Sequence, residues 1–140
     1  MNTLILDAAL GTQLAVNGEV VPDWKKSIWS AHALINKPEA ILKIHLDNIE
    51  AGADVITTSN YYATPVILAK DSVEHDYKEL VKRALHLVQE AIQISGKKCL
   101  IAGSFPPINV SFRPDLTGTK DELNDFYRNL GEIYKGNVDI

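Results

Sequence analysis

The sequence contains a single cysteine, Cys99, among its 140 residues. A disulfide bond within the chain is therefore excluded, and such low cysteine usage is typical of a reducing compartment, so we expect a cytoplasmic protein. No apolar run approaches the roughly 20 residues that a membrane-spanning helix needs. The first residues also lack the charged segment that opens a signal peptide, and we expect no membrane partner.

Positive charge is also scarce. The chain has 14 lysines and arginines against 18 acidic residues, a formal net charge of -4, and the basic residues form no cluster in the sequence. Nucleic acid is therefore not an expected partner. Neither of the glycine-rich phosphate-binding fingerprints, G-x-G-x-x-G and G-x-x-x-x-G-K-[ST], is present. The hydrophobic share of 46% and the charged share of 23% are those of an ordinary globular domain.

What the sequence does contain is an alternation of short apolar runs with amphipathic segments. We predict strands over 3–6, 55–58 and 99–102, the start of a fourth strand at 138–140, and helices over 38–50, 77–95 and 121–135. Strands that alternate with helices indicate an α/β protein with a parallel sheet. The missing nucleotide fingerprints favour a (β/α)8 barrel (a TIM barrel), which typically needs about 250 residues. We therefore predict that residues 1–140 form the N-terminal part of one barrel domain, with three βα units and the start of strand four.

Polar residues follow each predicted strand, in the stretches 7–12, 57–62 and 103–107. The carboxyl ends of parallel strands lie on one face of the sheet, where barrel proteins bind their ligands. A binding site at this face is thus one interpretation. The alternatives are that Asp7 caps the following helix and that the hydroxyl and amide groups of 57–62 only satisfy the loop backbone.

Three other residues can be explained by a structural role in packing. Trp29 could be an ordinary core residue, and His45, on a predicted helix, is more typical of packing than of ligand binding. Cys99 starts a strand, and we expect it to behave as a small buried hydrophobic residue.

Four motifs together give the chain a family resemblance. They are Leu6-Asp-Ala-Ala-Leu-Gly-Thr12, then Trp29-Ser-Ala with Pro38-Glu39, then His45-Leu-Asp47 continuing to Tyr62, and finally Ala102-Gly-Ser-Phe-Pro-Pro107. In this order they resemble the N-terminal half of the homocysteine S-methyltransferase family, the zinc-dependent thiol methyltransferases. The resemblance implies a homocysteine-binding (β/α)8 domain that transfers a methyl group to homocysteine and produces methionine.

The resemblance also implies a cofactor and a methyl donor. In the family, a zinc ion held by three cysteines binds the substrate sulfur as a thiolate, which is the nucleophilic form. Donors include S-methylmethionine, betaine and methylfolate, and the loop with Phe105-Pro-Pro107 and Phe112-Arg-Pro-Asp115 resembles that of members with a sulfonium donor. The family's zinc-binding cysteines belong to the second half of the barrel. We therefore expect the ligand cysteines outside these 140 residues, and we expect the chain alone to be inactive.

The resemblance assigns roles to individual residues. Asp7 matches the aspartate that binds the homocysteine amino group, and the backbone at Ala8 and Ala9 matches the stretch that binds the carboxylate. Trp29 and Tyr62 match aromatic positions near the donor, where a cation over an aromatic ring gains about 0.5 to 2 kcal/mol. The predicted substrate-binding set is completed by residues of the same strand ends: Gly11, Thr12, Asn60, Gly103 and Ser104.

A second function stays open at this point. The family usually has glycine where this chain has Ala8, and a methyl group there would obstruct close approach of the substrate carboxylate to the backbone. Together with the absent cysteines, this substitution motivates a non-catalytic, small-molecule-binding α/β half-barrel as the alternative. In either case a half-barrel exposes two sheet edges, so we expect self-association of the chain.

Overall fold

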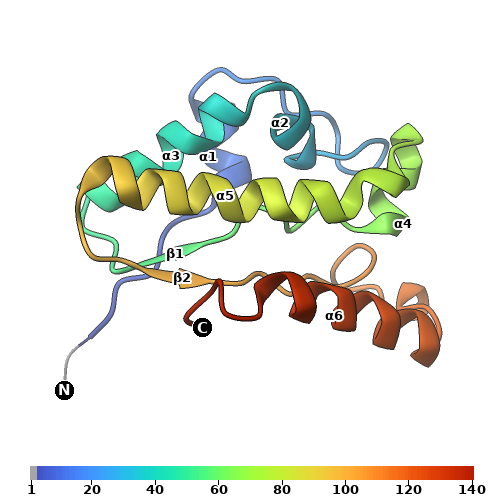
Figure 1. The fold of residues 1–140 in the computed structure, drawn as a ribbon. Coiled ribbons are helices and arrows are strands. Elements are labelled where there is room, and N and C mark those ends of the chain that lie inside the picture. Colours follow the sequence, from blue (N-terminus) through green and yellow to red (C-terminus); the bar gives the residue numbers. More distant parts are fainter. Residues whose placement is uncertain (1–2) are drawn as a thin grey trace.

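The computed structural model describes residues 3–140 as a mixed α/β chain with parallel strands (Figure 1). The helices are α1 (Leu10–Val16), α2 (Ala31–Asn36), α3 (Pro38–Glu50), α4 (Pro65–Leu68), α5 (Tyr77–Ser95) and α6 (Lys120–Tyr134), and the strands are β1 (Val55–Thr57) and β2 (Leu100–Ala102). Three short 3-10 turns lie at Ala69–Asp71, Glu74–Asp76 and Pro114–Leu116. Among these described helices, none has both the length and the apolar character to cross a membrane.

The two strands pair in parallel, with Ile56 opposite Ile101 and Thr57 opposite Ala102. The N-terminal segment joins the other side of β1 through a parallel bridge from Leu6 to Val55. The C-terminal segment joins β2, because the Ile140 amide donates to the Ile101 carbonyl at 3.2 Å and the Ile140 carbonyl accepts from Gly103 at 2.8 Å. The predicted parallel α/β arrangement is therefore confirmed, while the first and fourth predicted strands are paired segments and not full strands.

The first of these segments also corrects a prediction about burial. Residues 3–6 were expected to form a buried strand, but Leu4, Ile5 and Leu6 are 56%, 57% and 61% exposed. Backbone pairing ties this segment to β1 and its neighbour Asp54. The apolar pattern correctly indicates an extended segment, but it does not show whether other residues cover that segment.

The largest cluster of buried residues lies among helices α1 to α5, and a smaller part of the core lies between the strands and the helices α3 and α5. In Figure 1, α3 and α5 run side by side along the strands, and the two helices pack directly against each other. Ile56 is fully buried against Ile49 of α3 and against Val88 and Ala91 of α5. The apolar stripe of α5, read from the sequence at helical spacing, is the face that makes this contact.

The ends of the long helices follow from local chemistry and match the predictions. Pro38 occupies the first turn of α3, and Gly52 beyond its end has a φ of +101°. Gly96 ends α5 in the left-handed conformation. Thr119 caps α6 in a capping box: its hydroxyl accepts from the Glu122 amide at 3.3 Å, and the Glu122 carboxylate accepts from the Thr119 amide at 2.7 Å.

The short helices were not predicted. The pattern of residues 7–12, a polar stretch with Gly11 after a predicted strand, is typical of a turn, but α1 begins at Leu10 and Gly11 lies inside it. Gly11 is small because of packing: a Cβ atom there would lie 2.5 Å from Cη2 of Trp29. Helix α1 spans two turns and its N-cap residue, Ala9, has no capping side chain, so the sequence carries neither a long repeat nor a start signal for it.

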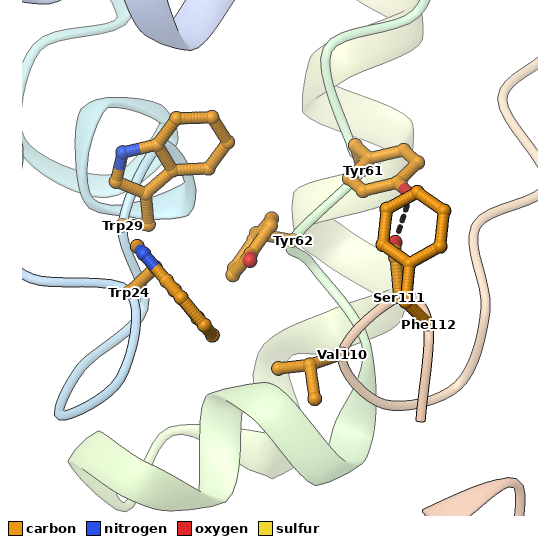
Figure 2. A pocket seen from close by; sticks show the side chains of 7 residues that line it. All are labelled: Trp24, Trp29, Tyr61, Tyr62, Val110, Ser111 and Phe112. Carbon is orange, nitrogen blue, oxygen red and sulfur yellow. Dashed lines mark hydrogen bonds between the residues drawn. The ribbon is translucent and has the colours of Figure 1, made fainter. Parts of the chain in front are cut away.

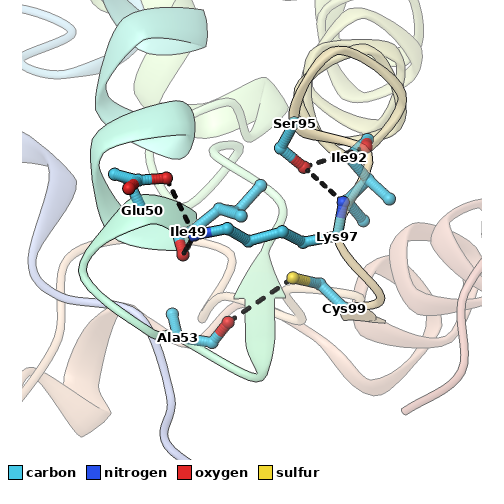
Figure 3. A network of polar contacts seen from close by, with 7 residues as sticks. All are labelled: Ile49, Glu50, Ala53, Ile92, Ser95, Lys97 and Cys99. Atoms are coloured by element: carbon cyan, nitrogen blue, oxygen red, sulfur yellow. Dashed lines mark hydrogen bonds and ion pairs between the residues drawn. The ribbon is translucent and has the colours of Figure 1, made fainter.

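His45 and Cys99 have different outcomes. His45 is 1% exposed within the core, which confirms its packing role. Cys99 is only partly buried, and its thiol donates a weak hydrogen bond to the Ala53 carbonyl at 3.4 Å (Figure 3). The prediction of a small buried hydrophobic residue is therefore confirmed only in part: Cys99 packs against the cluster that contains Ile56, but it stays partly exposed next to the polar turn where Lys97 pairs with Glu50 at 2.8 Å.

Candidate functional site: two adjoining clefts at the strand ends

A cleft of about 370 Å3, which we call the strand-end cleft, opens at the carboxyl ends of the N-terminal segment, β1 and β2. Its lining combines two alanines and a glycine with hydroxyl groups, two aromatic rings and one carboxylate. The residues are Leu6, Asp7, Ala8, Ala9, Leu10, Gly11, Trp29, Ser30, Thr57, Thr58, Ser59, Tyr61 and Ser104. Stretches far apart in the sequence therefore meet at the face where parallel α/β proteins bind ligands.

Asp7 supplies the only formal charge in this lining. Its carboxylate accepts hydrogen bonds from the Thr57 amide at 3.0 Å and from the Thr57 hydroxyl at 2.8 Å. Burial raises the pKa of the Asp7 carboxyl, and the two Thr57 hydrogen bonds oppose that rise. The side chain does not cap α1, so the capping alternative is wrong. A half-buried carboxylate that is oriented in this way favours a cationic ligand group.

The alternating orientation of successive side chains determines which residues at the end of β1 face the cleft. Successive side chains of an extended segment point to opposite faces. Thr57 bonds to Asp7 on the cleft side, and Ser59, two residues on, also lines the cleft. Thr58, between them, borders the cleft as well, but its hydroxyl donates to Asn60 beneath it. Asn60 lines neither of the two clefts described here and is fully buried.

A hydrogen-bond network beneath the cleft joins β1, β2 and α6. The Asn60 side-chain carbonyl accepts from the Thr58 hydroxyl at 2.7 Å and from the Tyr134 hydroxyl at 2.8 Å, while its amide group donates to the Ser104 carbonyl at 3.1 Å. The Ser104 amide donates to the Thr58 hydroxyl at 2.9 Å. Burial raises the pKa of Tyr134, which keeps the phenol neutral as a donor. This network fixes the two strand ends relative to each other.

A second cleft of about 320 Å3, the aromatic cleft, adjoins the first and shares Trp29 and Tyr61 with it. Trp24, Trp29, Tyr61, Tyr62 and Phe112 surround it together with Val110 and Ser111 (Figure 2). The Trp29 and Tyr62 rings meet edge to face with their centroids 4.9 Å apart. The Tyr61 hydroxyl hydrogen-bonds the Ser111 hydroxyl at 2.5 Å, which ties the loop after β1 to the loop that carries Phe112. Phe112 is fully exposed in a left-handed conformation, with φ +64°.

The structure brings most of the predicted site residues together. The strand-end cleft includes Asp7, Ala8, Ala9, Gly11, Trp29 and Ser104, and the aromatic cleft includes Trp29 and Tyr62. Thr12, Asn60 and Gly103 line neither cleft: Thr12 is exposed on α1, Asn60 belongs to the network, and Gly103 packs against the Tyr134 ring. Sequence reasoning did not single out Trp24 or Ser30, because no local signal marks a loop residue that only the fold brings to the site.

The described residues do not fit a zinc site. Among residues 3–140, no three histidine, cysteine, aspartate or glutamate side chains are placed to hold a metal ion. The single thiol, Cys99, precedes β2 and so lies at the amino ends of the strands, opposite the strand-end cleft. Burial and the nearby Asp54 carboxylate raise the pKa of this thiol, which disfavours the thiolate that zinc requires.

The charged cleft and the aromatic cleft both lie at the strand ends, the face where parallel α/β barrel proteins hold their ligands. Comparison with known proteins identifies the family: residues 4–140 match the homocysteine S-methyltransferase family model, and the chain belongs to this family. Homocysteine S-methyltransferase 4 of Zea mays is 38% identical over 94% of this chain, and homocysteine S-methyltransferase of Escherichia coli is 34% identical over 89%.

Comparison with solved structures points to the same family as the sequence comparison. The metallated form of the homocysteine methyltransferase MmuM from Escherichia coli superimposes on the whole chain with a TM-score of 0.81 at 28% identity. The chain covers 52% of MmuM and 44% of each of the two curated relatives, so it spans about half of their length.

Proposed function

We propose that this chain provides the amino-acid-binding half of a homocysteine S-methyltransferase. In this reading residues 1–140 are the N-terminal part of a (β/α)8 domain, with the strand order of the N-terminal segment, β1, β2 and the C-terminal segment as its first four positions. The observation that carries the proposal is the Asp7 carboxylate, which Thr57 orients at the strand ends beside an aromatic cleft. The family's reaction, transfer of a methyl group to the homocysteine thiol to give methionine, is the proposed activity of the whole protein.

The two clefts divide the proposed substrates between them. The homocysteine ammonium group pairs with Asp7 in the strand-end cleft, and its carboxylate meets the backbone at Ala8 and Ala9. The methyl donor occupies the aromatic cleft, where the faces of Trp29 and Tyr62 favour the positive charge of a sulfonium or quaternary ammonium group. Because the clefts share Trp29 and Tyr61, donor and acceptor would lie next to each other where the two clefts meet.

The proposal assigns no metal ligand to the residues of this chain. Family members are expected to use zinc to hold the substrate sulfur as a thiolate, but no residue set in the described chain fits that ion. The chain's own residues therefore bind and orient the two substrates, and we assign them no step at the sulfur. A cytoplasmic location and self-association through the exposed sheet edges also stay predictions.

The role of Asp7 can be tested by changing it to asparagine. Asp7→Asn removes the charge and keeps an oxygen that accepts from the Thr57 amide. We expect the affinity for L-homocysteine, measured by NMR titration, to fall roughly 10- to 100-fold, because a hydrogen bond to a charged group contributes about 1.5–3 kcal/mol. Folding stability at neutral pH should not fall, because a carboxyl group with a raised pKa is less stable when ionised in the folded chain than in the unfolded chain.

The matched control is Asp54→Asn, since the Asp54 carboxylate also accepts a backbone hydrogen bond, from Ile5 at 2.9 Å, but at the opposite end of β1. Its homocysteine affinity should equal that of the unchanged chain. Equal affinities for all three proteins, or no homocysteine binding at all, would remove the basis of the proposed site.

A further inference from the structure

Ser59 has a hydroxyl group that the fold leaves unused. The residue is 7% exposed and lines the strand-end cleft, yet its Oγ has no hydrogen-bond partner among residues 3–140. A buried hydroxyl without a partner destabilises a folded chain, and most buried polar groups are paired. A group of this kind that faces a cleft indicates a ligand that completes its hydrogen bonding.

The hydroxyl groups nearest to Ser59 in the sequence are already engaged, while Ser30 and Ser104 also bring hydroxyl groups to the cleft. Thr57 donates to Asp7, Thr58 donates to Asn60, and the Tyr61 hydroxyl bonds to that of Ser111. Ser59 therefore offers a free O–H donor on the same side of the chain as Thr57, where Asp7 lies.

The charge of the cleft decides which ligand group this donor meets. Asp7 is the one charged residue in the lining, and the lining contains no lysine, arginine or histidine. An amino acid whose ammonium group pairs with Asp7 therefore meets only neutral donors of this lining at its carboxylate. Backbone amides are one source of such donors, and the Ser59 hydroxyl is another.

We propose that the Ser59 hydroxyl donates a hydrogen bond to the carboxylate of the amino acid in the strand-end cleft. This inference rests on the proposed function, because it takes the ligand to be homocysteine. It adds a side chain that selects for the carboxylate, beyond the backbone contacts at Ala8 and Ala9. It also explains why the fold keeps an unpaired hydroxyl where alanine would fit the same space.

The test compares two probes in NMR titrations of the full chain. L-homocysteine carries the carboxylate, and aminopropanethiol has the same ammonium and thiol groups without it. For Ser59→Ala we expect about a tenfold loss of affinity for L-homocysteine and an unchanged affinity for aminopropanethiol. Ser59→Cys, which has nearly the same shape but a weak donor, should behave like the alanine variant. The unfolding midpoint of Ser59→Ala should stay equal or rise, because the variant removes an unpaired polar group.

Ser95→Ala is the matched serine control, since Ser95 ends α5 away from the cleft and bonds only to its own helix end (Figure 3). It should bind L-homocysteine as the unchanged chain does. Unaltered homocysteine affinity in Ser59→Ala, or an equal loss for both probes, would overturn the carboxylate assignment while the Asp7 result still supports the proposed function. Failure of the unchanged chain to bind L-homocysteine would overturn both.

Discussion

Acidification is expected to destabilise this chain through His45, and replacing His45 with leucine should remove that sensitivity. The His45 side chain is buried in α3 and neither ring nitrogen has a hydrogen-bond partner in the described structure. Burial lowers the pKa of His45 from 6.5 to about 4, because the charged imidazolium cannot be solvated there. The folded chain therefore binds this proton less readily than the unfolded chain.

The sign of the effect follows from that difference. Between pH 6.5 and about 4 the unfolded chain holds a proton on His45 that the folded chain lacks, so stability falls as the pH falls through this window. A difference of that size corresponds to about 3 kcal/mol of unfolding free energy. Asp7 acts in the opposite direction, since its raised pKa makes the folded chain bind its proton more readily. The His45 contribution must therefore be isolated by comparing variants.

Urea unfolding across this pH range measures the contribution of His45 to the unfolding free energy. The unfolding free energy of His45→Leu relative to the unchanged chain should increase by about 3 kcal/mol between neutral pH and about pH 4. His75→Gln is the control, because the side chain of His75 is 74% exposed. Its stability should follow that of the unchanged chain across the range. Parallel stability curves for His45→Leu and the unchanged chain would show that His45 is not buried in its neutral form.

The second large effect is expected at Asn60, whose side chain makes three hydrogen bonds beneath the strand-end cleft. Asn60→Ala leaves the Thr58 hydroxyl, the Tyr134 hydroxyl and the Ser104 carbonyl with fewer partners in a buried region. Each unsatisfied buried group costs about 1–3 kcal/mol, so we expect the unfolding free energy to fall by about 3 kcal/mol or more. A variant without a cooperative unfolding transition in urea would have lost even more unfolding free energy, which is the same outcome.

Two comparisons make the Asn60 result specific. Tyr134→Phe removes one donor of the network and should cost about 1 kcal/mol. Asn36→Ala removes an exposed asparagine with one bond to the His32 carbonyl, and it should change stability by less than about 0.5 kcal/mol. A loss at Asn60 no greater than that at Asn36 would mean that the network does not hold the strand ends together.

The long helices and their order along the chain were predictable because the sequence signals for them are local and strong. The stripes of α3, α5 and α6, the proline at Pro38 and the glycines at Gly52 and Gly96 each determine a helix face or a helix end. The short helices α1 and α2 lack such signals, and tertiary packing decides their conformation. Helix α4 has a threonine cap at Thr64 and a proline in its first turn, but its single turn is too short to show an apolar stripe.

The site was predictable at the strand ends and, through the family resemblance, at the aromatic residues Trp29 and Tyr62. Asp7 and Ser104 follow their strands directly, so the rule that ligands bind at strand ends places them correctly. Asn60 shows the limit of that rule, because alternation turns it away from the cleft while Ser59 faces it. Trp24 reaches the aromatic cleft from a loop, a position that depends on the packed fold and not on any local pattern.

Methionine formation is the measurement that tests the central claim most directly. The product of the complete reading frame that contains these residues should be incubated with L-homocysteine and, in separate reactions, S-methylmethionine, betaine and a methylfolate. We expect methionine with at least one donor, and roughly 10- to 100-fold less after Asp7→Asn at low homocysteine concentration, because the ammonium group of homocysteine loses its charged partner. Absence of methionine with all three donors would contradict the central claim and favour a small-molecule-binding protein without methyl transfer.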